Sequence, residues 1–330
     1  MSIDRISHRF VETNGIRLHL AECGTGPLVI LCHGFPETWY SWRHQLAALA
    51  AAGFHAVAPD MRGYGQSAAP PEIERYTLLH LVGDLTGLLE ALQADTAVIG
   101  GHDWGAPVAW HAALLRPDRF RAVIALSVPF GGRASARPTT LMPQNEHEQF
   151  YQLYFQAPGV AEAELEADAR RSLRAILLSA AGEGARPVPA DAPIAMVPRD
   201  GGLLTRFKDR PTPLPMWLSE ADLEVYAGDF QRSGFRGGLN WYRNIDRNWE
   251  LLAPWDGAKI IVPALYIAGE RDLVVNFPGA RQAIARMPAR VPALQPPRLL
   301  AGCGHWTQQE RPAEVNAAMI EFLRTLGASA

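Results

Sequence analysis

Hydrophobic and polar positions near the start of the chain predict an antiparallel hairpin that leads into a buried strand. Apolar and polar residues alternate over 6–15 and again over 16–24, with Asn14-Gly15 between the two segments. This pattern is typical of a β-hairpin. The run LVILCHGF (28–35) is almost continuously apolar, as in a strand that is buried on both faces of a parallel sheet.

The following segments alternate between helical periodicity and short apolar runs. Helices are predicted at 41–53, 77–92, 106–117 and 312–326, and a further helix between the last two strands. Strands are predicted at 56–60, 96–103, 122–129 and 260–270, and a last strand is predicted at the start of the segment 298–306. Strands that alternate with helices indicate a mostly parallel central sheet covered by helices, so the fold class is α/β.

This alternation stops between about Phe130 and Pro254, where the chain reads as helical or irregular, without a convincing buried strand. Residues 161–180 predict one long helix, and residues 182–202 predict an irregular excursion. A sheet interrupted in this way predicts a core with a helical lid inserted after the sixth strand. The expected division is core (1–130), lid (131–254) and core (255–330).

Composition narrows the function classes. The chain of 330 residues has a formal net charge of -3, and its Lys and Arg residues form no blocks, which disfavours nucleic acid as a partner. No apolar run approaches the roughly 20 residues that span a bilayer, and the polar start lacks a signal-peptide core. Cys23, Cys32 and Cys303 show no CxxC spacing, so neither disulfides nor a metal site is expected. A cytoplasmic location is the default expectation.

The stretch GGHDWGA (100–106) carries the first candidate chemistry. A strand, then Gly-x-nucleophile-x-Gly, then a helix is the nucleophile elbow of the α/β-hydrolase fold, and Asp103 occupies its central position. The alternative is that Asp103 merely caps the helix that follows. Asp272 after a late strand and His305 after the last strand complete the order nucleophile, acid, histidine that the fold requires, and this favours the elbow.

The loop HGFP supplies a second element of the site. In this fold, one backbone N–H after the third core strand and one from the residue after the nucleophile form the oxyanion hole. The donors are expected to be Phe35 and Trp104. His33 and His102 are expected to brace these loops by hydrogen bonds, and no metal or cofactor is predicted.

An aspartate at the elbow predicts displacement at an sp³ carbon instead of acyl transfer. A carboxylate attacks amides and esters poorly, but it can displace a leaving group and form an ester whose acyl carbon is its own. Water activated by His305, oriented by Asp272, then cleaves this ester. A halide or an epoxide oxygen can leave, and only the epoxide oxygen needs a proton donor. Tyr151 and Tyr242 in the lid are candidate donors, although packing alone also explains lid tyrosines.

The segments HGFPE, GHDWG, FYQLYFQAPGVAEAELEAD, SGFRGGLNWYRN and CGHWTQ together resemble the epoxide hydrolases of the α/β-hydrolase fold, in particular the catalytic domain of the soluble type. The resemblance covers nearly the whole chain. It implies Asp103 as nucleophile, His305 and Asp272 as base and orienting acid, and Tyr151 and Tyr242 as proton donors, with Tyr154 a rival of Tyr151. The separate phosphatase domain of the mammalian enzymes is not expected here.

The resulting expectation is a detoxification-type hydrolase that converts a small apolar epoxide and water to a vicinal diol, without a cofactor. Phe35, Trp39, Trp104 and Met196 are expected to line its pocket, and the variable segment 182–216 is expected to shape one wall. A homodimer is compatible with the sequence. A haloalkane dehalogenase with the same Asp-His-Asp triad is the main alternative. A binding protein that has lost its chemistry and a serine esterase are weaker ones.

Overall fold

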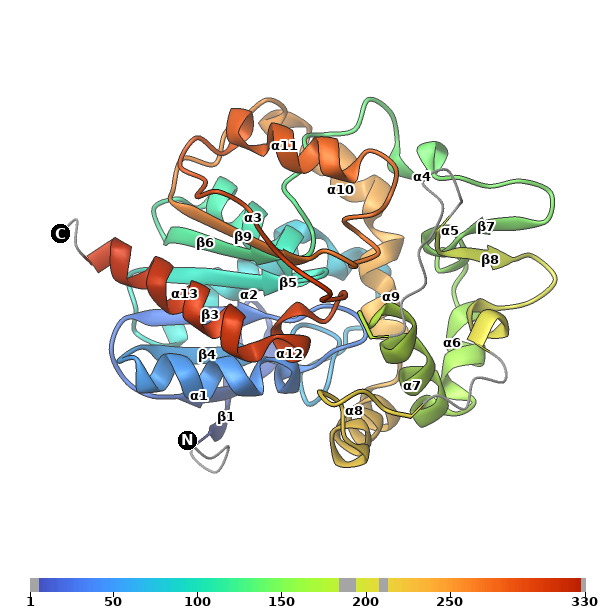
Figure 1. Ribbon diagram of the computed structural model, residues 1–330, viewed down its shortest axis with the longest axis horizontal. Helices are drawn as coiled ribbons and strands as arrows, with labels where there is room; N and C mark the ends of the chain where they lie inside the picture. The colour runs from blue at the N-terminus through green and yellow to red at the C-terminus, as the bar shows by residue number, and fades with distance from the viewer. Residues whose placement is uncertain (1–5, 184–193, 208–212, 328–330) are drawn as a thin grey trace.

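The computed structural model describes residues 6–183, 194–207 and 213–327 (Figure 1). The described residues form an eight-stranded sheet with the order β1-β2-β4-β3-β5-β6-β9-β10. The strands are β1 (Ser7–Thr13), β2 (Ile16–Cys23), β3 (Leu28–Cys32), β4 (His55–Pro59), β5 (Ala97–His102), β6 (Phe120–Leu126), β9 (Ala264–Gly269) and β10 (Arg298–Leu300). The first two strands pair antiparallel, β2 also runs antiparallel to β4, and all other pairs are parallel.

Helices cover both faces of this sheet, because its central strands are apolar on both sides. In β3, Ile30 packs into the cluster that holds α2 (Leu78–Ala91) and α3 (Gly105–Leu115), whereas Val29 packs into the cluster that holds α1 (Arg43–Ala51) and α13 (Pro312–Gly327). Such a strand has no polar face to turn to solvent, which is why its sequence does not alternate. The core helices are η2 (Trp39–Trp42), α1 (Arg43–Ala51), η3 (Ile73–Tyr76), α2 (Leu78–Ala91), α3 (Gly105–Leu115), α11 (Ala280–Arg290), α12 (Thr307–Glu310) and α13 (Pro312–Gly327).

The elements between β6 and β9 make up the inserted part of the chain. They are α4 (Pro138–Leu141), β7 (Glu148–Phe150), α5 (Tyr151–Tyr154), α6 (Val160–Glu166), α7 (Ala169–Ala180), β8 (Met196–Pro198), η4 (Leu203–Phe207), α8 (Glu220–Ser233), α9 (Arg236–Arg243), α10 (Ile245–Leu251) and η5 (Ala253–Trp255). Figure 1 shows α5 to α8 with β7 and β8 on one side of the sheet, away from both termini. The exact division at residues 130 and 254 stays a prediction.

Two expectations for the insertion were wrong. The helix expected over 161–180 is two helices, α6 and α7, because Asp168 adopts an extended conformation and its side chain caps α7 by accepting from the Arg171 N–H at 2.9 Å. The insertion also contains a short, partly buried pair of strands, in which Phe150 of β7 pairs with Met196 of β8. Three-residue strands are too short to produce a recognisable period in the sequence.

The remaining differences concern element ends. The strand expected over 28–35 ends at Cys32, and residues 33–35 form a loop in which the peptide bond between Phe35 and Pro36 is cis. The helix expected over 41–53 is a 3-10 turn followed by α1. Within the described ranges, no helix has the length and apolar character needed to cross a membrane.

Candidate active site

Asp103 occupies a sharp turn between β5 and α3. Its φ of 49° lies in the left-handed region, a conformation that costs a non-glycine residue about 1–3 kcal/mol and is concentrated at functional sites. The flanking glycines are required by close backbone approach, because a Cβ on Gly101 would lie 1.9 Å from the Gly105 carbonyl oxygen and a Cβ on Gly105 would lie 2.1 Å from that of Cys32. The turn therefore raises the Asp103 side chain above the end of the strand.

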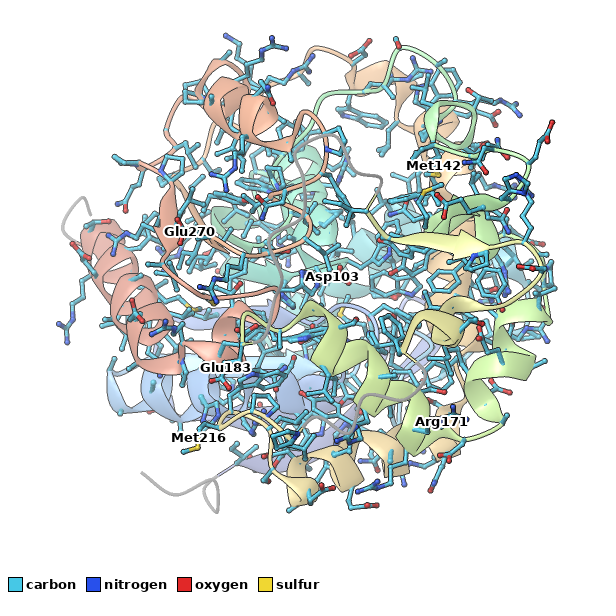
Figure 2. The ribbon with its side chains drawn as sticks, turned by 45° about the vertical axis from the view of Figure 1, so that its right-hand side comes forward. Asp103, Met142, Arg171, Glu183, Met216 and Glu270 are labelled. Carbon is cyan, nitrogen blue, oxygen red and sulfur yellow. The ribbon has the colours of Figure 1, made fainter. Side chains whose placement is uncertain are left out.

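The Asp103 carboxylate is held from the HGFP loop. Its Oδ1 accepts a hydrogen bond from the Phe35 N–H at 2.8 Å. The following helix, α3, begins at Gly105 and has no side-chain cap, which disfavours the alternative in which Asp103 serves only to cap it. Asp103 is buried, with 9% of its surface exposed, and Figure 2 places it near the centre of the molecule, between the sheet and the inserted elements.

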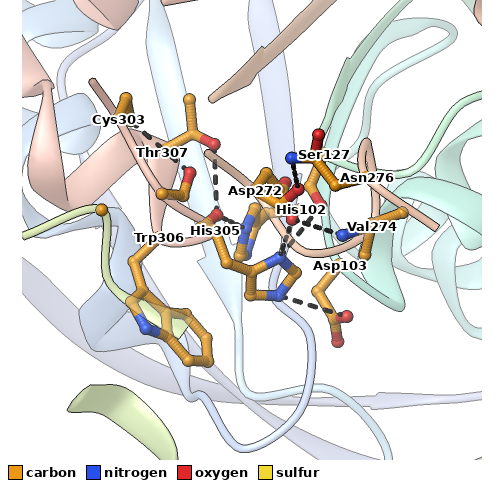
Figure 3. Close-up of polar contacts among 12 residues, drawn as sticks. His102, Asp103, Ser127, Asp272, Val274, Asn276, Cys303, His305, Trp306 and Thr307 are labelled. Carbon is orange, nitrogen blue, oxygen red and sulfur yellow. Dashed lines mark hydrogen bonds and ion pairs between the residues drawn. The ribbon is translucent and has the colours of Figure 1, made fainter. Parts of the chain in front are cut away.

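The structure brings Asp272 and His305 to Asp103, as the sequence predicted for the three side chains. His305 Nδ1 lies 3.0 Å from Asp272 Oδ1, and His305 Nε2 lies 3.5 Å from Asp103 Oδ2 (Figure 3). Asp272 is fixed in turn, since Oδ1 accepts from the Val274 N–H at 2.9 Å. The imidazole thus stands between two carboxylates, one of which faces a cavity.

This arrangement shifts the pKa of both partners. Burial by itself lowers the pKa of His305, but the charges of Asp272 and Asp103 and its hydrogen bonds to them raise it well above the ordinary value. Burial by itself raises the pKa of Asp272, but the charge of His305 and hydrogen bonds from His305, Ser127 and the Val274 N–H lower it. Removal of either carboxylate charge therefore lowers the affinity of His305 for its proton.

Ser127 is a further residue of this cluster, and no role was predicted for it from the sequence. Its Oγ lies 3.1 Å from His305 Nδ1 (Figure 3), and its φ of 71° is again left-handed. Ser127 directly follows β6, and the carboxyl ends of the strands in an open α/β sheet are where ligand sites form. The position of Ser127 at the end of a predicted strand is the sequence signal that could have identified it as a site residue.

A buried network of side chains braces the loops around the site. The His33 ring accepts from the Met61 N–H at 2.9 Å and donates to the Gly34 carbonyl, and burial lowers its pKa. His102 lies between Glu37 Oε2 at 2.7 Å and the His305 carbonyl oxygen at 2.7 Å. Both histidines were expected to brace loops. Glu37 was not singled out, although it completes the HGFPE motif. Among the described residues, no group of three or more His, Cys, Asp or Glu is placed to hold a metal.

Tyr151 and Tyr242 lie together at the cavity that Asp103 also lines. Their ring centroids are 5.9 Å apart, and both side chains line the same cavity as Asp103 and His305. Burial and nearby negative charge, that of Asp103 included, raise the pKa of both phenols, so they are protonated. Tyr154 is placed elsewhere, with its hydroxyl donating to Glu164 Oε2 at 2.8 Å.

The cavity has a volume of about 360 Å³ and a mostly apolar lining. Its lining residues are Phe35, Asp103, Tyr151, Phe155, Ile176, Ser179, Ala180, Ile194, Ala195, Met196, Leu203, Phe207, Tyr242, Leu273, Val274, His305 and Trp306. Five of them belong to the variable segment expected to shape one wall; the parts of that segment at 184–193 and 208–212 lie outside the described residues.

Two residues expected in the pocket lie outside it. Trp39 packs edge-on against His8 and Tyr40. The Trp104 side chain does not line the cavity, but packs behind Tyr242, with ring centroids 5.1 Å apart and nearly perpendicular planes. In both cases the position in a motif was informative about the backbone and not about the direction of the side chain.

Comparison with known proteins identifies the fold and the family. The family model for the alpha/beta hydrolase fold matches residues 27–312. The chain is 48% identical to epoxide hydrolase A of Mycobacterium tuberculosis, over 97% of this chain and 98% of that protein. It is 43% identical to bifunctional epoxide hydrolase 2 of Sus scrofa, over 97% of this chain and 56% of that protein.

A solved structure agrees with these relatives. An epoxide hydrolase from an endophytic Streptomyces superimposes with a TM-score of 0.93 at 49% identity, over 98% of this chain and 97% of that one. The chain is therefore similar to epoxide hydrolases along almost its whole length. This length includes the elbow with Asp103, the side chains of Asp272 and His305 beside it, and the inserted lid elements. The chain belongs to the epoxide hydrolases of the α/β-hydrolase fold.

Proposed function

We propose that this enzyme opens an epoxide through an ester with Asp103 and then hydrolyses that ester with water activated by His305, which yields a vicinal diol. The observation that carries the proposal is the Asp103 carboxylate itself. One of its oxygens is held by the Phe35 N–H, and the other lies beside His305 at the floor of an apolar cavity. A carboxylate in a cavity of this kind is suited to attack an sp³ carbon.

In the first step, Asp103 Oδ2 attacks a ring carbon, and the bond between that carbon and the epoxide oxygen breaks. The electron pair goes to the oxygen, which takes a proton from Tyr151 or Tyr242. Both phenols are neutral in the cavity because burial and the Asp103 charge raise their pKa. A neutral phenol is still far more acidic than an alcohol, so it can protonate the leaving oxygen as it forms.

In the second step, water attacks the acyl carbon of the Asp103 ester and gives up a proton to His305. The ester has lost the negative charge of Asp103, which helped to raise the pKa of His305. The pKa of His305 therefore falls once the ester forms, and the imidazole can then act as the base that the second step needs. Asp272 orients the ring, and the N–H groups of Phe35 and Trp104 stabilise the oxyanion at Oδ1. Collapse of this intermediate expels the diol oxygen, which takes the proton from His305. The Asp103 carboxyl group then gives up its remaining proton, which restores both the carboxylate and the hydroxyl of the tyrosine that acted as donor.

The substrate is proposed to be a small apolar epoxide. Besides Asp103, His305 and the two tyrosines, the described lining residues include the polar side chain of Ser179. None of the described lining residues is a lysine or an arginine. A negatively charged group on the substrate would lose its water here without gaining a cationic partner, at considerable cost. Neutral epoxides are therefore favoured over ones that carry a carboxylate near the ring.

Loss of either tyrosine hydroxyl is expected to slow ring opening. Tyr151→Phe and Tyr242→Phe each keep the ring packing in the cavity but remove one proton donor, which is worth on the order of 10- to 1,000-fold in the alkylation rate. Pre-steady-state measurement of ester formation checks this. Tyr154→Phe is the matched control, since that hydroxyl bonds to Glu164 outside the cavity. Unchanged alkylation in both cavity variants would place the proton donor elsewhere.

The haloalkane dehalogenase alternative is tested by product. Styrene oxide is expected to give phenylethanediol, and a chloro- or bromoalkane of similar size is expected to release no halide above the uncatalysed rate. The paired phenols favour this outcome, because a leaving halide needs no proton whereas an epoxide oxygen does. Halide release without diol formation would reverse the assignment.

A further inference from the structure

The backbone around His305 is fixed by two acceptors that lie outside the Asp-His-Asp cluster. The backbone N–H groups of three consecutive residues, 304–306, donate hydrogen bonds to these acceptors. Those of Gly304 and Trp306 donate to the two oxygens of Glu310, at 2.9 Å and 3.1 Å, and that of His305 donates to the Ala180 carbonyl oxygen at 2.9 Å. One carboxylate thus holds the residues on either side of the histidine, and the residue between them is held by a helix end.

That helix end belongs to α7 of the inserted elements. The last carbonyl groups of a helix have no partner within it, and two of those in α7 are satisfied from the histidine loop. Ala180 accepts from the His305 N–H, and Leu177 accepts from the Trp306 indole N–H at 2.7 Å. Just beyond the helix, the Gly182 N–H donates to the same Glu310 oxygen as Gly304, at 2.9 Å. The close approach leaves no room for a side chain at Gly304, where a Cβ would lie 2.1 Å from the Gly182 nitrogen.

Glu310 is itself set apart from the surface charges around it. It ends the short helix α12 in a half-buried position, and among the described residues no Lys or Arg forms an ion pair with it, whereas its neighbour Arg311 pairs with Glu314. Burial raises the pKa of the Glu310 carboxyl, and the hydrogen bonds from the N–H groups of Gly304, Gly182 and Trp306 and the charge of His305 oppose that rise. Its contacts are therefore directed to the backbone of the histidine loop and of the α7 end.

We propose that Glu310 is a positioning residue for the hydrolytic step: it clamps the loop that carries His305 onto the end of α7. This inference rests on the function proposed above, in which His305 acts in the second step and Asp103 in the first. Glu310 touches neither substrate nor reacting atoms, so its effect passes through the placement of the imidazole. A displacement of about 1 Å in a reacting group can cost on the order of 100-fold in rate.

The two steps therefore respond differently to changes at Glu310. Glu310→Ala removes the acceptor for the N–H groups of Gly304, Trp306 and Gly182 and is expected to slow ester hydrolysis about 10- to 100-fold. Ester formation, which depends on Asp103 and the tyrosines, is expected to change less than about threefold. Glu310→Gln keeps one oxygen acceptor but turns an NH₂ group toward an N–H group, and its effect is expected to lie between those of the parent and the alanine variant. Because the ester accumulates, KM should fall together with kcat.

The experiment is a single-turnover reaction of the full chain with styrene oxide, quenched at intervals and analysed by intact mass for the alkylated enzyme. Both rate constants are first-order properties of the folded molecules, so a variant that folds in reduced yield still reports them. Glu314→Gln is the matched control, since it makes the same change one turn along on an exposed side chain and should leave both rates as in the parent. His305→Gln is the reference for a lost base.

Slowed hydrolysis with near-normal ester formation, graded from Gln to Ala at position 310, supports the clamp. Equal loss in both steps would mean that Glu310 has only a general structural role, and unchanged hydrolysis would mean that the histidine loop holds its place without it; either result overturns the proposal. If His305→Gln forms no ester at all with a substrate that the parent converts, the two-step function fails first, and this inference falls with it.

Discussion

Asp103→Asn is expected to abolish diol formation, with a fall in kcat of at least about four orders of magnitude, on the scale measured when a nucleophile is removed from a hydrolase. The amide keeps an oxygen that can accept from the Phe35 N–H, as Oδ1 does at 2.8 Å in the parent, so the turn and the cavity should persist. A neutral amide is a poor nucleophile toward carbon, and no ester can form. Diol release from styrene oxide measures the loss.

Recovered activity in this variant has a specific explanation that can be checked. Slow deamidation converts the introduced asparagine back to aspartate, so any activity should grow with storage time in step with a mass increase of about 1 Da in the peptide that contains position 103. Asp118→Asn is a suitable control, because it changes an exposed carboxylate and should leave turnover intact. Full activity in freshly purified Asp103→Asn enzyme, without the mass increase, would contradict a nucleophilic role.

His305→Gln is expected to stop turnover after the first step and to trap the enzyme as its ester. Glutamine fills similar space but cannot take a proton from water, and a fall of about four orders of magnitude in ester hydrolysis is expected by comparison with other triads. Asp103 and both tyrosines remain in place, so styrene oxide should add its mass, with close to one adduct per chain. Intact-mass analysis at successive times measures it.

The location of that adduct is part of the expectation. Peptide mapping should place it on Asp103, and the double variant Asp103→Asn with His305→Gln should carry none. An inactive His305→Gln enzyme that stays unmodified while it binds a confirmed ligand would contradict the covalent scheme. Asp272→Asn should behave in the same direction but less severely, because it leaves the base present and removes the contact at 3.0 Å that orients it.

Much of the fold was predictable from local signals of the chain. The hairpin at Asn14-Gly15 and the doubly buried β3 follow from turn chemistry and from hydrophobic period, and the structure confirms both. The approach of Asp103, Asp272 and His305 also followed, since each lies at or just beyond the carboxyl end of a predicted strand of one parallel sheet. Parallel strands end at the same edge, so residues far apart in sequence must meet there.

The errors have two physical origins, which are long-range packing and a local helix cap. Trp39 follows the motif HGFP closely, yet packs against His8 of β1, which no local pattern encodes. The break between α6 and α7 depends on the extended conformation of Asp168, although the apolar period continues across it. A capping aspartate before a helical run is the signal that could have placed this boundary.

The residues that support the site could not be predicted from the sequence, because their roles depend on long-range packing. The residue type alone indicates no role for Glu37, Ser127 or Glu310. Their importance comes from contacts to His102, His305 and the histidine loop. The contacts of Glu37 and Ser127 join residues that are 65 and 178 positions apart, and Glu310 joins the histidine loop to Gly182, which lies 128 positions away. Only the assembled fold shows which backbone and side-chain groups a given carboxylate or hydroxyl serves.

The central claim is that Asp103 becomes an ester and that water attacks its acyl carbon, and a single turnover in heavy-oxygen water tests this most directly. With enzyme in excess over styrene oxide, one ¹⁸O atom should appear in the Asp103 peptide, and the first diol released should contain none, because its new oxygen comes from the carboxylate. Label in the diol with an unlabelled Asp103 would contradict the account, since water would then attack the epoxide itself.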